Sequence, residues 1–139
     1  MDWNEDGKKD LVTASASGKI LLFLNTGTND QPLLSSDGLI MQKSGPLEVG
    51  IHPGLCITDG NSDGRKDLLF GTEDRMLYLY LNTGTNENPE FDTYDFLECG
   101  DEIIQIGFSM LFPETADLNC DGKKDLILGN SSGSIYFYS

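Results

Sequence analysis

Residues 2–10 read DWNEDGKKD, with oxygen-bearing side chains at the first, third, fifth and ninth positions and a glycine at the sixth. The pattern returns at residues 59–67 as DGNSDGRKD and at residues 117–125 as DLNCDGKKD. The steps between the copies are 57 and 58 residues. Internal repetition at a fixed period of this length usually sets the architecture of a protein.

The repetition extends beyond the acidic stretches. KDLVTASASGKILLFLNTGTNDQP in the first unit matches KDLLFGTEDRMLYLYLNTGTNENP in the second, and the third gives KDLILGNSSGSIYFYS. Each unit contains two short apolar runs separated by a turn, a weaker run (residues 33–41 and 91–97), and another run just before the acids. Short β-rich runs divided by turn residues predict an all-β protein.

The arrangement of the sheets follows from the second apolar run of each unit. In MLYLYL, residues 76–81, the side chains are apolar on both faces of the expected strand. In a sheet with one solvent-exposed face, apolar and polar residues would alternate along each strand. Because they do not alternate here, this strand is expected to be covered on both sides. Units of about four antiparallel strands, each packed between neighbours, predict the blades of a β-propeller.

Each acidic loop offers a set of hard oxygen ligands in a flexible turn, which suits Ca²⁺. Mg²⁺ prefers fewer protein ligands and a stricter octahedron, and Zn²⁺ would favour His or Cys. We therefore predict up to three calcium sites, each using four side chains and one backbone carbonyl. The predicted ligands are Asp2, Asn4, Asp6, the Lys8 carbonyl and Asp10; Asp59, Asn61, Asp63, the Arg65 carbonyl and Asp67; and Asp117, Asn119, Asp121, the Lys123 carbonyl and Asp125.

EF-hand and dockerin loops begin with the same spacing. An EF-hand, however, needs a bidentate acid at loop position 12 and helices on both sides. Position 12 is Thr13, Phe70 or Leu128 here, and the flanks read as strands. The missing acid at position 12 and the strand context therefore disfavour the EF-hand.

The motif D-x-N-x-D-G-x-x-D-L followed by two strands resembles the FG-GAP or VCBS repeat of integrin α-subunit β-propellers and of many secreted proteins. IGFSM at residues 106–110 resembles the "FG" part of the motif, whereas the "GAP" part is degenerate and has Ala14 in place of glycine in the first unit. The resemblance covers nearly the whole chain. It implies Ca²⁺ in the loop between the first and second strands of each blade, mainly holding the loop, with ligands bound elsewhere on the propeller.

The composition of the whole chain disfavours some classes of binding partner. The formal charge of the 139 residues is −14, from 23 acidic and 9 basic side chains, which argues against nucleic acid and anionic membranes. No apolar run is long enough for membrane insertion. Because calcium would stabilise the fold mainly where free Ca²⁺ is high, we expect an extracellular or cell-surface (secreted) setting. The three cysteines do not settle the compartment.

We expect one repeat domain over residues 1–139, with blade units at 1–41, 42–99 and 100–139. The first unit has no opening strand and the third no closing strand, giving about two and a half blades. Closed propellers usually have four to eight blades. The chain is therefore expected either to contact the remaining blades of a parent chain, which we favour, or to complete a ring as a homo-oligomer.

The remaining candidate residues favour packing over chemistry. His52, the only histidine, shows no sequence partner for catalysis, so no catalytic residue and no cofactor other than calcium is predicted. The strand tyrosines are expected to pack between blades, and NTGT is expected to form tight turns. Trp3 is expected either to pack against the place of the absent strand or to lie exposed. The expected function is a non-enzymatic structural or recognition module that binds an unidentified protein or carbohydrate ligand. The alternatives are a lectin-type propeller and an accessory domain of a carbohydrate-active enzyme.

Overall fold

A computed structural model describes residues 1–107 and 110–139. Phe108, on which part of the FG resemblance rests, lies outside the described residues. The described residues form strands, turns and bends with no helix, so the predicted all-β class is confirmed. Accordingly, no helix in this part of the chain has the length and apolar character to cross a bilayer.

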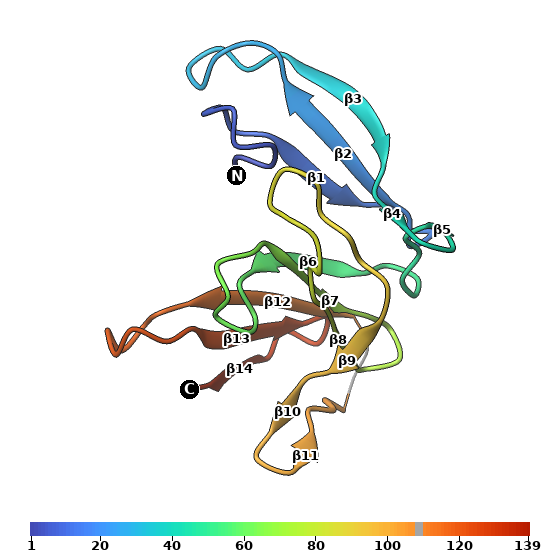
Figure 1. Ribbon diagram of the computed structural model, residues 1–139. Helices are drawn as coiled ribbons and strands as arrows, with labels where there is room; N and C mark the ends of the chain where they lie inside the picture. Colours follow the sequence, from blue (N-terminus) through green and yellow to red (C-terminus); the bar gives the residue numbers. More distant parts are fainter. Residues whose placement is uncertain (108–109) are drawn as a thin grey trace.

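Three antiparallel sheets follow one another along the chain (Figure 1). The first contains β1 (Leu11–Ala14), β2 (Ile20–Asn25) and β3 (Leu34–Leu39). The second contains β6 (Gly54–Thr58), β7 (Asp67–Gly71), β8 (Leu77–Tyr80) and β9 (Tyr94–Phe96). The third contains β12 (Leu111–Ala116), β13 (Asp125–Asn130) and β14 (Ile135–Tyr138). In each sheet the strands are paired in sequence order, as in propeller blades.

The apolar runs expected in the units correspond to these strands, four in the second sheet and three in each of the other two. The register is regular: in the second sheet Leu69 pairs with Cys56 on one side and with Leu79 on the other. A β-bulge between Leu22 and Phe23 interrupts the pairing of β2 with β3. The arrangement is a partial propeller with no closed barrel, in agreement with the predicted fold.

Two short hairpins connect the sheets, and the sequence pattern did not predict them. One pairs β4 (Met41–Gln42) with β5 (Gly45–Pro46), and the other pairs β10 (Glu98–Cys99) with β11 (Glu102–Ile103). Each turn contains a glycine with positive φ, 137° at Gly45 and 68° at Gly100. A side chain at either position would be strained, so glycine permits the reversal.

The segments after the two hairpins fasten each sheet to the next. The amide of Val49 donates to the carbonyl of Gly18 at 3.0 Å, and the amide of Ile106 donates to the carbonyl of Arg75 at 3.4 Å. The alternating apolar residues of these segments are buried: Leu47, Val49, Ile104 and Ile106. These segments, LEVG at residues 47–50 and IQIG at residues 104–107, occupy equivalent positions in the repeat and therefore close the gap between neighbouring sheets.

Two hydrophobic cores lie between the sheets. The first gathers Ile20 and Leu22 of the first sheet with Leu68 and Phe70 of the second. The second gathers Leu77 and Leu79 of the second sheet with Leu126 and Leu128 of the third. The middle sheet is buried on both faces, as expected for a blade between two others.

Trp3 and the last strand differ from the expectations. Trp3 is buried in the first core, with 4% of its surface exposed, because residues of the second sheet close over it. Of the two alternatives expected for Trp3, exposure was therefore wrong. Conversely, Ile135 of β14 is 77% exposed, although its equivalent Leu77 is fully buried. The third sheet has a neighbour on only one face, so β14 is not covered on both sides as the pattern predicted.

Candidate functional site: three acidic loops

The three acidic loops lie on the same side of the molecule, at the left in Figure 1. The second joins β6 to β7, the third joins β12 to β13, and the first leads into β1. In all three, the fourth and sixth positions have positive φ: Glu5, Ser62 and Cys120 lie near 62°, and the glycines that follow lie between 83° and 86°. Glycine at the sixth position allows this tight coil without strain.

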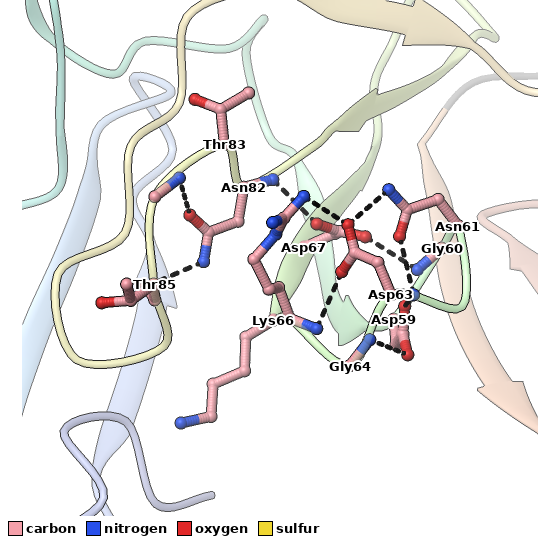
Figure 2. A network of polar contacts seen from close by, with 12 residues as sticks. Asp59, Gly60, Asn61, Asp63, Gly64, Lys66, Asp67, Asn82, Thr83 and Thr85 are labelled. Atoms are coloured by element: carbon pink, nitrogen blue, oxygen red, sulfur yellow. Dashed lines mark hydrogen bonds and ion pairs between the residues drawn. The ribbon is translucent and has the colours of Figure 1, made fainter.

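The first and third side chains hold the loop through its own amides. In the second loop, the amide of Asp63 donates to Asp59 at 3.0 Å and to Asn61 at 3.1 Å, and the amide of Gly64 donates to Asp59 at 2.9 Å (Figure 2). The same three hydrogen bonds form in the first loop and in the third. Three independent copies of the sequence thus adopt one backbone geometry.

The fifth side chain accepts a hydrogen bond from the amide two residues later. The Asp63 carboxylate accepts a hydrogen bond from the backbone amide of Arg65 at 2.9 Å. It also accepts hydrogen bonds from the side-chain amide of Asn61 and from the guanidinium group of Arg65. Desolvation acts to raise the pKa of Asp63, but these hydrogen bonds and the arginine charge outweigh it, so the pKa lies below its usual value. In the third loop, the Lys123 amide and then the Asn119 side chain lower the pKa of Asp121. Both carboxylates therefore stay ionised at neutral pH.

The ninth side chain is a buried clamp. Asp67 is fully buried and accepts the amide of Gly60 on one oxygen and the amide of Asn82 on the other, both at 2.8 Å. Asp10 does the same with the amides of Trp3 and Asn25. Burial, together with the nearby charges of Asp63 and Asp59, raises the pKa of Asp67 against the opposing effect of these hydrogen bonds. In the first and second loops the ninth acid thus joins the acidic loop to the end of the second apolar strand, and in the third loop Asp125 accepts the amide of Leu118.

The NTGTN segments support the loops, a role that the sequence analysis missed. The side chain of Asn82 accepts the amides of Gly84 and Glu90 and donates to the carbonyl of Thr85, which folds the segment (Figure 2). Asn86 then contacts the acidic loop, donating to the Gly64 carbonyl at 3.1 Å and accepting the Lys66 amide at 2.8 Å. Asn25 and Asn29 repeat these contacts in the first unit.

The donor set of each loop fits a hard cation, because its side chains supply oxygen ligands and three of the four are carboxylates. A carboxylate that accepts one amide hydrogen keeps further lone pairs for a metal. The described residues nevertheless contain no group of three or more Asp, Glu, His or Cys side chains close enough together to hold a metal ion. In the second loop a cation would be held by side-chain oxygens that already accept amide hydrogens, those of Asp59, Asn61, Asp63 and Asp67.

Other residues singled out in the sequence lie outside these loops. His52 has a partner after all, since its Nδ1 lies 2.6 Å from Glu73 Oε1. Tyr80 packs in the first core, as expected for a tyrosine between blades, whereas Tyr136 on β14 is exposed. The three cysteines are free thiols: Cys56 is buried, and Cys99 and Cys120 are exposed.

Comparison with known proteins agrees with the geometry. A family model described as an FG-GAP-like repeat matches residues 59–128, just over half of the chain. The match begins at the first residue of the second acidic loop and runs through the third loop into β13. A search of curated proteins and a search of solved structures found no match. The chain therefore belongs to the FG-GAP-like repeat family.

Proposed function

We propose that this protein is a non-enzymatic calcium-binding β-propeller module that forms a structural or recognition part of a secreted or surface protein. The observation that carries the proposal is the triple occurrence of one oxygen-rich loop with the same hydrogen bonds and the same two positive-φ positions. A solvated acidic turn would not need to keep this backbone geometry in three copies.

Calcium would supply a substantial part of the stability. Extracellular calcium modules bind with Kd of roughly 10⁻⁴ to 10⁻³ M. With Kd of ~10⁻⁴ M and free Ca²⁺ of ~10⁻³ M, each site would stabilise the fold by ~1.4 kcal/mol. Three sites would contribute ~4 kcal/mol, against a usual net stability of ~5 to 15 kcal/mol. This dependence on free Ca²⁺ favours an extracellular setting.

Thermal unfolding in Ca²⁺, in Mg²⁺ and in chelator tests the proposal. We expect Ca²⁺ at ~10⁻³ M to raise the Tm by roughly 10 °C or more over chelator, and Mg²⁺ to raise it much less. In Asp59→Ala the calcium-dependent part of the shift should fall by about a third, because one of three equal sites is lost. Asp95→Ala, which removes the same charge from β9 outside the loops, is the matched control. Equal Tm in calcium and in chelator would refute the proposal.

We further propose that another unit of the same repeat, in a longer parent chain, covers the outer face of the third sheet. Ile135 and Phe137 are 77% and 54% exposed, whereas the equivalent Leu77 and Leu79 of the second sheet are buried by the third. Exposed apolar surface on an edge strand favours association. Light scattering during size exclusion is the test: monomers or a polydisperse mixture support a parent chain, and a single oligomer of defined size would favour a ring of copies.

A further inference from the structure

A pocket of about 250 Å³ between the second and third sheets is lined by the equivalents of residues that bury Trp3. In the first core, Trp3 packs with Leu22 and Ile40. The residues 57 positions later, Leu79 and Leu97, line the pocket instead. The two spaces between sheets are therefore built alike, but only the first contains an indole.

Gly60 takes the place of Trp3 in the second loop. Both residues stand at the second loop position, and both donate their amide to the ninth Asp of the loop, at 2.7 Å for Trp3 and 2.8 Å for Gly60. Their backbones are thus held in the same way. A Cβ on Gly60 would first meet the two methyl groups of Leu79, at 2.9 and 3.0 Å, so it would point toward the pocket. The pocket is the space that a tryptophan side chain at this position would use.

The walls of the pocket divide into an apolar and a polar part. Leu69, Leu79 and Leu126 are buried and, with Leu97, supply the apolar part. The polar part includes Thr58 and Thr115, whose hydroxyls are hydrogen-bonded at 2.9 Å.

Two lysines, Lys123 and Lys124, also line the pocket and are exposed to solvent. Neither ammonium group forms a close ion pair within 1–107 and 110–139, although the charge of Lys123 acts on Asp121 and helps to lower its pKa. The one acid of the lining, Asp59, already accepts the amides of Asp63 and Gly64. The pocket thus combines an apolar slot with available positive charge, in a chain whose net charge is −14.

We propose that this pocket binds a planar aromatic molecule carrying a carboxylate, with the ring in the leucine-lined slot and the carboxylate directed toward Lys123 and Lys124. An apolar cavity of about 150 Å³ is enough to take up benzene, so the available volume suffices for a larger ring. The space beside Trp3 provides a contrast. That pocket, of about 300 Å³, is lined by Asp37, Glu87 and Glu90, which would repel a carboxylate. An aromatic anion should therefore select the pocket at Gly60.

Calorimetric titration of the full chain with indole-3-acetate and with indole is the test. We expect indole-3-acetate to bind about two- to fivefold more tightly than indole, the range that an exposed ion pair supplies. Lys124→Ala should reduce this preference while leaving indole binding unchanged. Absence of binding by both probes at millimolar concentration, or equal binding of the two, would overturn the proposal.

Gly60→Trp tests the location, because the new indole should fill the slot and abolish binding of both probes. Leu118→Trp is the matched control: it adds the same side chain at the second position of the third loop, outside the pocket lining, and should leave binding unchanged. If Gly60→Trp does not fold, Leu97→Trp narrows the pocket from the opposite sheet edge. Unchanged binding in the folded Gly60→Trp or Leu97→Trp variant would overturn the proposal. Repeating the titrations in chelator shows whether probe binding depends on bound calcium, because Asp59 of the second acidic loop also lines the pocket.

Discussion

The carboxylate of Asp67 joins two segments that are 22 residues apart in the sequence, because one of its oxygens accepts the backbone amide of Asn82 at 2.8 Å while the other accepts that of Gly60. Asp67 is fully buried, so neither amide can exchange this partner for water. The carboxylate at the ninth position therefore has a structural role that does not depend on a metal: its hydrogen bonds hold the loop in place.

Asp67→Asn should destabilise the protein strongly. Asparagine has one acceptor oxygen, and its NH₂ group would face one of the two buried amides, which costs about 1–3 kcal/mol of unfolding free energy. The measurement is urea unfolding in chelator, so that calcium does not contribute. Asp63→Asn in the exposed part of the same loop should lose less stability. A loss for Asp67→Asn no larger than that for Asp63→Asn would contradict the clamp.

Trp3→Ala should be among the most destabilising substitutions in the chain. It removes a buried indole between two sheets and leaves a cavity, with an expected loss of about 3–5 kcal/mol. Leu118→Ala is the matched control at the same loop position; since Leu118 is 53% exposed, the expected change is within about 0.5 kcal/mol. Added indole should restore part of the Trp3→Ala stability. Similar losses in the two variants would contradict the placement of Trp3.

Asp74 provides a pH-dependent contribution. Burial acts to raise its pKa, but hydrogen bonds from Thr72, Tyr78 and the Met76 amide outweigh burial, so the pKa of Asp74 is lowered. A lowered folded-state pKa gives stability that is complete above the unfolded value of about 3.9 and is lost as the pH falls through the folded pKa.

The stability difference between the wild type and Asp74→Asn should therefore be constant from about pH 5 to 7 and should shrink below about pH 4. Asp95→Asn, which changes an exposed carboxylate on β9 with no hydrogen bond or ion pair among the described residues, is the matched control. Unfolding measured across pH 2–7 gives the comparison. A difference that grows toward acid would mean that the pKa of Asp74 is raised, contrary to this account.

The sequence predicted the strands and the acidic loops because both are local and occur in repeated copies. It did not predict the burial of Trp3, whose partners Leu68 and Phe70 lie more than 60 residues away and come close only when the sheets stack. A comparison of the second loop position across the repeats, which holds Trp3, Gly60 and Leu118, would have drawn attention to it.

The sequence also contains a repeated spacing that indicates the contact made by the ninth acid. Asp10 and Asn25 are 15 residues apart, as are Asp67 and Asn82, and each pair is linked by a buried hydrogen bond. The spacing alone does not reveal that both carboxylate oxygens face backbone amides, because the second amide belongs to a different segment. The pairing of His52 with Glu73 was hidden for the same reason: their contact depends on how the connecting segment crosses the hairpin turn.

Calorimetric titration of the chain with Ca²⁺, after complete removal of bound metal, tests the central claim most directly. We expect three Ca²⁺ per chain, Kd values of ~10⁻⁴ to 10⁻³ M and weaker binding of Mg²⁺. Asp59→Ala should reduce the number to two, and Asp95→Ala should leave it at three. Absence of Ca²⁺ binding at millimolar concentration, or a stoichiometry unaffected by Asp59→Ala, would contradict the claim that each acidic loop is a calcium site.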